Sequence, residues 1–225
     1  MDALLRNFFN LEVFQQVFPF LLQGLLTTIG LSLLVIPLGL AGGLFVALVA
    51  TQTESRLVRI LVAIYVDVFR ALPPLVLLIF IYFGFPFLGI DMPKLLAVAL
   101  GFLLNNASYY GEIFRAGLMA VPQGQMEAAR STGLSRLQAL TYVVVPQATR
   151  NVLPDLIGNS IEVVKLTTLA SVVALPELLR VARDAQSLLY NPSPVVLAAL
   201  IYLALLWPLV RLLSRLEHKN MIVRR

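Results

Sequence analysis

Long apolar runs without an ionisable residue constrain this chain more than any other feature of its sequence. The longest extends from Val13 to Thr53. Hydrophobic residues make up 59% of the chain and charged residues only 13%, whereas soluble domains carry roughly 25% charged residues. A membrane-spanning helix needs about 20 apolar residues, while the strands of an outer-membrane barrel are about 10 residues long and alternate in polarity. These continuous runs therefore predict an all-α integral membrane protein.

We expect five transmembrane helices in one transmembrane domain that covers residues 1–225. The predicted spans are 18–51, 57–84, 93–114, 152–175 and 195–215. The start, Met1-Asp2-Ala3, lacks the basic residues of a cleavable signal peptide, so we expect the first apolar segment to be retained. The sequence contains no cysteine, which excludes a disulfide framework and a thiolate metal site. The first span contains a G-x-x-x-G pattern at 39–43, which predicts close packing against another helix.

The basic residues favour one orientation in the membrane. With the N-terminus outside, eleven Lys and Arg residues fall in inside segments, four fall outside and two lie within spans. Cytoplasmic loops of membrane proteins are enriched in Lys and Arg, so we expect the C-terminus and the 115–150 loop to be cytoplasmic. This topology also explains the net charge of +5 without a nucleic-acid partner. The inside residues are Arg56, Arg59, Arg115, Arg130, Arg136, Arg150, Arg211, Arg215, Lys219, Arg224 and Arg225, and the outside ones are Arg6, Lys94, Arg180 and Arg183.

Local chemistry predicts two short helices in the loop at 122–146. Pro122 suits a first helical position, where its missing N–H costs nothing. Gly133 stands where a helix can end in a left-handed turn. Ser135 and Gln138 then form an S-x-x-Q capping box for a second helix. The sequence thus predicts a compact helix-turn-helix on the cytoplasmic side.

The same loop contains a spaced motif. Glu127-Ala128-Ala129 is followed after three residues by Gly133, and after nine more by Val143-x-Val145-Pro146. This spacing resembles the EAA loop of bacterial ABC importer permeases, with valines at the positions usually occupied by Ile and Leu. The resemblance implies coupling helices that dock into an ATPase, with Glu127, Ala128, Ala129, Gly133 and Pro146 as coupling residues. We expect the two alanines to leave the surface free of bulk for the partner.

Other segments resemble the polar amino acid permease subfamily over about residues 20–215. They are Arg70-Ala71-Leu72-Pro73-Pro74-Leu75, Gly111-Glu112-Ile113-Phe114-Arg115-Ala116-Gly117, Pro146-Gln147-Ala148, Leu153-Pro154 and Lys165-Leu166-Thr167-Thr168-Leu169-Ala170-Ser171. The first departs from the family's R-G-T-P-L pattern at two places. The resemblance implies a fold like that of type I ABC importers and ATP-driven uptake of polar amino acids by alternating access across the bacterial inner membrane. It also implies three partners: a cytoplasmic ABC ATPase dimer, an external solute-binding protein and a second permease subunit, identical or homologous.

Polar residues within spans are costly and usually face a bundle interior, a water-filled cavity or a partner. Glu162 and Lys165 are three residues apart, so they can meet on one helical face, as can Asp67 and Arg70. One interpretation makes Lys165 a partner for a substrate carboxylate; the other makes both pairs structural, which we favour for Asp67 and Arg70. Asn159 stands where family members that handle cationic amino acids tend to carry an acid, so a cationic side chain is less expected. The candidate substrate-path residues are Lys165, Glu162, Asn159, Asn105, Asn106, Ser108 and Arg70.

The sequence argues against catalysis by the chain itself. It contains no G-x-x-x-x-G-K-[ST] element, so we expect ATP hydrolysis on a separate subunit. Its single histidine, His218, lies in the tail among charged residues, and we expect no catalytic residue, cofactor or metal. Two alternatives remain open: an ion-coupled carrier or channel, and a membrane scaffold that does not transport. The amino acid carried, and homodimer against heterodimer, are also left open.

Overall fold

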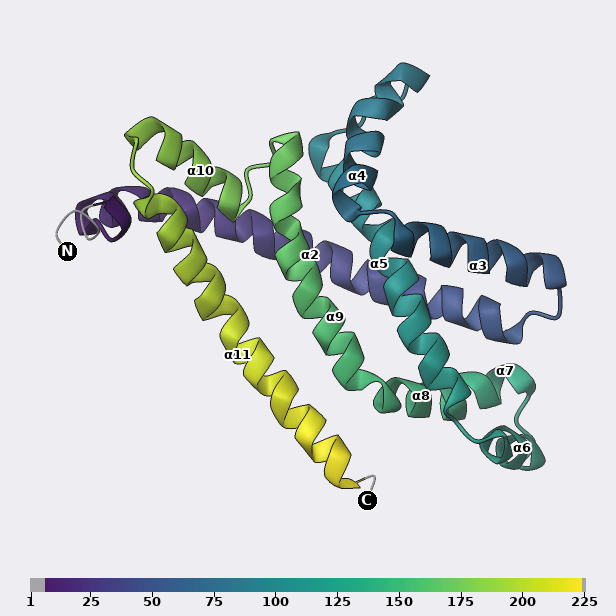
Figure 1. The fold of residues 1–225 in the computed structure, drawn as a ribbon. Helices are drawn as coiled ribbons and strands as arrows, with labels where there is room; N and C mark the ends of the chain where they lie inside the picture. The colour runs from purple at the N-terminus through teal and green to yellow at the C-terminus, as the bar shows by residue number, and fades with distance from the viewer. Residues whose placement is uncertain (1–6, 224–225) are drawn as a thin grey trace. The chain divides into compact units, whose positions relative to one another are not determined.

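The computed structural model describes residues 7–223, with side chains described for 7–215. The side chains of Arg6, His218, Lys219, Arg224 and Arg225, used above, therefore lie outside the described residues. Within 7–223 the secondary structure is helical and includes no strand, as predicted (Figure 1). The elements are α2 (Leu11–Gln52), α3 (Arg56–Ala71), α4 (Pro74–Ile79), η1 (Phe80–Gly84), η2 (Phe85–Leu88), α5 (Lys94–Met119), α6 (Gln123–Ser131), α7 (Arg136–Ala139), η3 (Leu140–Val144), α8 (Val145–Asn151), α9 (Leu153–Leu166), η4 (Thr167–Val173), α10 (Leu178–Leu189) and α11 (Ser193–Val223).

Three helices within the described residues are long and apolar enough to cross a membrane: Leu11–Gln52, Leu153–Val173 and Ser193–Arg215. A fourth results if Arg56–Ala71 and Pro74–Leu88 form one broken span. The remaining long helix, α5, is apolar in its first half, but Asn105 and Asn106 begin a polar second half. The count of five spans therefore stays a prediction.

The second predicted span is not one continuous helix. Leu72, the C-cap of α3, has extended backbone angles of φ −76° and ψ 126°. Pro73 explains this, because a proline disfavours helical geometry in the residue before it. Prolines at 73 and 74 thus separate α3 from α4, and they leave the carbonyl end of α3 without helical partners.

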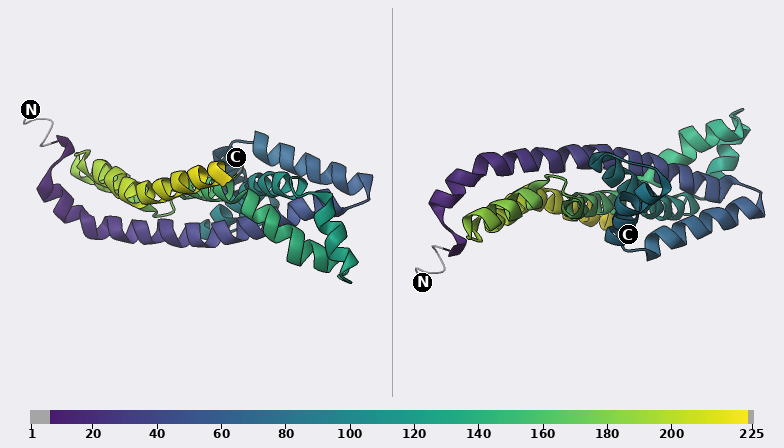
Figure 2. Two further views of the ribbon diagram at one scale, coloured as in Figure 1. Left: turned by 90° about the horizontal axis from the view of Figure 1, so that it is seen from below. Right: turned by 90° about the horizontal axis from the view of Figure 1, so that it is seen from above.

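The described chain divides into two compact units, each considered by itself. The first comprises Met1–Val35, Leu75–Gly101 and Ser160–Arg225, and the second comprises Ile36–Pro74 and Phe102–Asn159. In the first unit, α10 lies beside the early part of α2 (Figure 2). One apolar cluster of this unit consists of Val17, Leu21, Leu178, Ala182 and Ala198. A Cβ at Gly24 would lie only 2.9 Å from Leu178 Cα, so α2 requires a glycine there.

The second unit is held by close packing between α2 and α5. A Cβ on Gly43 would lie 2.4 Å from Tyr110 Cβ and 2.8 Å from the Gly111 nitrogen. A Cβ on Gly39 would meet the Tyr110 ring at 3.1 Å. The close contact predicted from the G-x-x-x-G pattern is therefore confirmed, with α5 as the partner helix.

Candidate functional site

The candidate loop at 122–146 is a short helix, a glycine turn and a second helix, all within the second unit. α6 ends at Ser131, and Gly133 follows with φ +93°, a left-handed conformation that disfavours residues with a Cβ. Its N–H donates to the Arg130 carbonyl at 3.0 Å. The predicted capping box is present at α7: Ser135 Oγ accepts from Gln138 N, and Gln138 Oε1 accepts from Ser135 N. These features confirm the predicted helix-turn-helix.

Two details of the predicted loop are wrong. Pro122 is the N-cap of α6 and not its first helical residue. Ala129 is buried, because it lies on the inner face of α6 near η3, so only Ala128 offers the small exposed surface predicted for both alanines. In the V-x-V-P segment, Val144 is buried while Val143 and Val145 are partly exposed. Periodicity alone did not reveal this, because residues 140–144 form a π-helix whose repeat differs from that of an α-helix.

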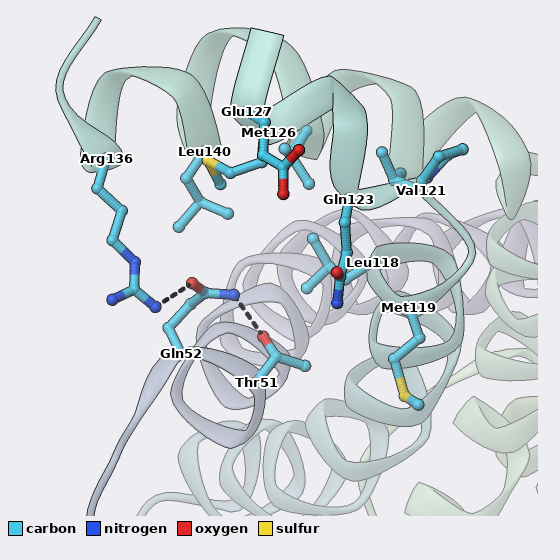
Figure 3. A pocket seen from close by; sticks show the side chains of 12 residues that line it. Thr51, Gln52, Leu118, Met119, Val121, Gln123, Met126, Glu127, Arg136 and Leu140 are labelled. Carbon is cyan, nitrogen blue, oxygen red and sulfur yellow. Dashed lines mark hydrogen bonds between the residues drawn. The ribbon is translucent and has the colours of Figure 1, made fainter. Parts of the chain in front are cut away.

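A cavity of about 360 Å³ lies between the loop and the end of α2. Figure 3 shows the Glu127 carboxylate and the Gln123 amide directed from α6 into this cavity, with Thr51 and Gln52 of α2 on the opposite side. Apolar side chains complete the lining: Leu118, Val121, Met126, Leu140 and Val144. The loop therefore faces the end of α2 across a partly polar space.

One side chain connects the loop to the turn between α2 and α3. The Arg136 guanidinium donates to Gln52 Oε1 at 3.5 Å and lies 4.0 Å from Glu54 Oε1. Arg136 and Glu54 are both well exposed, and exposed ion pairs contribute about 0–1 kcal/mol. This contact orients the loop without fixing it.

Charges in the second unit pair differently from the sequence prediction. Glu112 accepts two hydrogen bonds from Arg115, each at 2.8 Å, and its Oε2 lies 3.7 Å from Arg70 Nη1. Arg70 also lies over the Tyr109 ring, 5.5 Å from its centroid. The predicted Asp67–Arg70 pair is therefore wrong: Arg70 is in the last turn of α3 and approaches the acid on α5.

The polar stretch of α5 completes the broken end of α3. Asn105 Nδ2 donates to the Phe69 carbonyl at 2.8 Å, and Tyr109 Oη donates to the Arg70 carbonyl at 3.4 Å. These carbonyls would otherwise lack partners, which is costly inside a membrane. Asn106 and Ser108 are also buried, but they bond to carbonyls of their own helix, Phe102 and Asn105. Part of the polarity of α5 is thus structural.

Two buried amide atoms of the second unit have no hydrogen-bond partner: Asn105 Oδ1 and Asn159 Nδ2. The first can only accept a hydrogen bond and the second can only donate one. In the first unit, Lys165 Nζ donates to Glu162 Oε1, so the predicted ion pair is present, with both side chains about half exposed. The seven candidate residues divide between the units: Glu162 and Lys165 belong to the first, and Asn159, Asn105, Asn106, Ser108 and Arg70 to the second.

The sequence analysis missed a buried acid in the first unit. Glu177 is fully buried, caps α10 through the Leu179 and Arg180 N–H groups, and accepts from Tyr202 Oη at 3.1 Å. Burial raises the pKa of its carboxyl, although the two backbone N–H groups and the Tyr202 hydroxyl oppose the shift. Beside it, Thr28 Oγ1 accepts from Leu178 N at 3.2 Å. The sequence did contain one signal for this cap, an acidic residue directly before a helix. The signal was weak because Asp is a preferred N-cap residue and Glu is not.

Comparison with known proteins agrees with the motif. Residues 39–221 match the family model described as "Binding-protein-dependent transport system inner membrane component". The chain is 35% identical over 198 residues to the probable amino-acid ABC transporter permease protein YckA of Bacillus subtilis, covering 88% of this chain and 87% of that protein. It is 34% identical over 207 residues to the probable glutamine ABC transporter permease protein GlnP of Bacillus subtilis, with 90% and 94% covered.

Solved structures show the same fold. A chain from the "Crystal structure of an amino acid ABC transporter with histidines" has a TM-score of 0.80 and 34% identity, covering 91% of this chain and 95% of that one. An inward-facing MetNI methionine ABC transporter has a TM-score of 0.71 at 19% identity, with 89% and 95% covered, which is a likeness of fold alone. The predicted resemblance to ABC importer permeases is confirmed: the chain belongs to the family of binding-protein-dependent transport system inner membrane components.

Proposed function

We propose that this chain is the permease subunit of an ATP-driven importer that moves polar amino acids across the bacterial inner membrane by alternating access. The single observation that carries the proposal is the helix-turn-helix at Gly133, which has the residues and spacing of a coupling loop. Its family membership supports the same machine class. The chain has no P-loop, so the ATPase is a separate subunit.

Three partners complete the proposed importer: a cytoplasmic ABC ATPase dimer, an external solute-binding protein and a second permease subunit. The family description itself names dependence on a binding protein. The coupling residues are Glu127, Ala128, Ala129, Gly133 and Pro146. Since Ala129 is buried, its small size lets α6 approach η3, while Ala128 remains available to the ATPase. Closure of the ATPase dimer would displace the loop across the cavity at the end of α2.

The names of the relatives support polar amino acids as the substrate class, since several are named as amino-acid or glutamine permeases. An amino acid carries an ammonium and a carboxylate and needs groups of both signs in a shielded site. Within the first unit, Lys165 would hold the carboxylate and Glu162 the ammonium. In the second unit, Asn105 and Asn159 each retain an unsatisfied amide atom that a ligand can bond. Asn106, Ser108 and Arg70 are weaker candidates because they already have partners.

The proposal is tested by uptake into vesicles that contain this chain, its ATPase and its binding protein. We expect accumulation of a polar amino acid that requires ATP and all three components. Uptake that persists without the ATPase would favour an ion-coupled carrier. No uptake with every component present would favour a scaffold that does not transport.

The docking role of the loop is tested by Gly133→Pro. Proline fixes φ near −65° and lacks an N–H, whereas Gly133 has φ +93° and donates to Arg130. We expect the variant to insert into the membrane normally and to lose ATPase association in pull-down. The matched control is Gly124→Ala in the neighbouring α6, where a Cβ meets nothing within 4 Å. Normal ATPase association by Gly133→Pro would contradict the docking assignment.

A further inference from the structure

An apolar groove of about 280 Å³ lies in the first unit between the start of α2 and α10. Val17 and Phe20 of α2 form one wall, and Val181, Ala185 and Leu188 of α10 form the other. Phe20 is 57% exposed and Leu188 is 80% exposed, so both groove-lining side chains are accessible from outside the unit. The groove is smaller than the roughly 300–1,000 Å³ of sites for drug-sized ligands. Its size and lining suit a single hydrocarbon chain.

Polar groups are placed at this groove by both helices. Gln16 and Asp184 are its polar lining residues. Asp184 Oδ2 accepts from Arg180 Nε at 3.0 Å, and both side chains are partly exposed. The groove therefore has a carboxylate in its lining, and the guanidinium paired with that carboxylate lies next to it, so a ligand with both signs of charge could engage the pair.

The groove lies where the first span begins. The predicted span starts at residue 18, between Val17 and Phe20, and α10 lies in the loop that follows the fourth span. Phe18 and Leu22 do not line the groove, but both are exposed apolar side chains in the same stretch of α2. Long amphipathic groups are favoured at such a membrane–water boundary, where one end is apolar and the other hydrated. An acyl chain in the groove would thus be continuous with the bilayer.

We propose that this groove binds one phospholipid whose headgroup carries an ammonium and a phosphate, namely phosphatidylethanolamine. One acyl chain lies between α2 and α10, the ammonium donates to Asp184 and the phosphate accepts from Arg180. The primary ammonium distinguishes this lipid from phosphatidylcholine, whose nitrogen has no hydrogen to donate. Phosphatidylglycerol has no ammonium, so it offers Asp184 no partner beyond Arg180. A charge-assisted bond of this kind adds geometric selectivity as well as attraction.

The test is lipid retention. The purified chain is equilibrated in nanodiscs that contain equal amounts of phosphatidylethanolamine, phosphatidylcholine and phosphatidylglycerol with matched acyl chains. The lipids that remain bound after gentle detergent extraction are then quantified by native mass spectrometry. We expect enrichment of phosphatidylethanolamine. Asp184→Asn should lower its ratio to phosphatidylcholine by a factor of roughly 1.4 to 5, the range expected for one partly exposed ion pair. Total lipid should change little, because Arg180 remains free to bind either phosphate.

The matched control is Arg183→Gln. Arg183 is an exposed arginine on the same helix, but it lines a different surface with Tyr190 and Asn191. Its replacement should leave the retained lipids unchanged. Ala185→Trp should fill the groove and lower retention of all three lipids. Ala185 also borders the apolar cluster, so the exposed Leu188 provides a second groove variant, Leu188→Asn. The melting temperature of each variant is compared with that of the parent chain.

Equal retention of the three lipids by the parent chain would overturn the proposal. So would an Asp184→Asn variant with an unchanged lipid ratio, or groove variants that keep full retention. If the groove instead received a second copy of the chain, the groove variants would lower dimerisation and leave lipid retention unaltered. The test needs no ATPase and measures no uptake, so its failure is distinct from failure of the proposed transport function.

Discussion

Individual polar side chains in this protein bond mainly to backbone carbonyls and N–H groups. Asn105 completes the end of α3, Thr28 accepts from the α10 backbone, and Glu177 caps α10. Each of these groups is buried, where an unpaired polar group costs about 1–3 kcal/mol. Polarity within the helices is therefore not by itself a sign of substrate contact. The unsatisfied atoms of Asn105 and Asn159 are stronger indications than the residue types.

Exchanging the two charges at positions 162 and 165 tests whether this ion pair binds substrate or has only a structural role. The double variant Glu162→Lys with Lys165→Glu keeps an ion pair three residues apart on α9. We expect normal membrane insertion and ATPase association but strongly reduced amino acid uptake, because each charge now meets the wrong end of the substrate. The single variants Glu162→Gln and Lys165→Gln are the controls. Full uptake by the exchanged pair would show that the pair is only structural.

Glu177 should make stability depend on pH. Its folded-state pKa is raised above the ordinary value of about 4.3, so the folded state binds more protons between these two values. By linkage, the stability contributed by this group is full below the ordinary pKa and is lost as pH rises through the raised one. In thermal unfolding from pH 4 to 8, the parent chain should lose stability relative to Glu177→Gln as pH rises. Parallel curves for the two proteins would contradict this.

Glycines and prolines determine where the helices pack closely and where they end. α2 crosses both units and has glycines where neighbouring helices come nearest: Gly24 against α10 and Gly43 against α5. At the carboxyl end of α3, prolines interrupt the helix and α5 supplies the missing donors. In the coupling loop, Gly133 provides a turn between two short helices. Thus glycine and proline define element boundaries and contacts, and apolar residues fill the space between.

Gly43→Ala should weaken the contact between α2 and α5. The added Cβ would lie 2.4 Å from Tyr110 Cβ and close to backbone, so the helices must separate. Overpacking of this kind costs about 1–3 kcal/mol, which we expect as a lower melting temperature in detergent. Gly30→Ala on the same helix is the control, because nothing lies within 4 Å of its new Cβ and alanine favours helix. Equal melting temperatures for the two variants would rule out the contact as a source of stability.

For the molecule as a whole, orientation in the membrane gives each surface its role. The charge pattern predicts that the proposed coupling loop lies in the cytoplasm and α10 outside. The chain has no cysteine, so any introduced cysteine is its only thiol. Ser131 and Ser187 form a matched pair: both are exposed, and each hydroxyl donates to the carbonyl four residues earlier at 3.0 Å.

In intact cells made permeable only at the outer membrane, we expect a membrane-impermeant thiol reagent to label Ser187→Cys and not Ser131→Cys. Disruption of the inner membrane should make Ser131→Cys equally reactive, which controls for intrinsic reactivity of the two sites. The expected pattern follows from the rule that segments rich in Lys and Arg lie on the cytoplasmic side. Labelling of Ser131→Cys in the intact cells would reverse the proposed orientation.

The helical membrane class, the helix-turn-helix of the proposed coupling loop and the family could all be predicted from the sequence. These depend on local properties: continuous apolar runs, a glycine with left-handed backbone at 133, and a capping box between Ser135 and Gln138. Three other features became visible only in the folded chain: Ala129 is buried, Arg70 approaches Glu112, and Glu177 accepts a hydrogen bond from Tyr202. The burial of Ala129 depends on how α6 packs near η3 in the same loop, and the other two features depend on helices brought together from distant parts of the chain. No local pattern encodes which helix faces will meet.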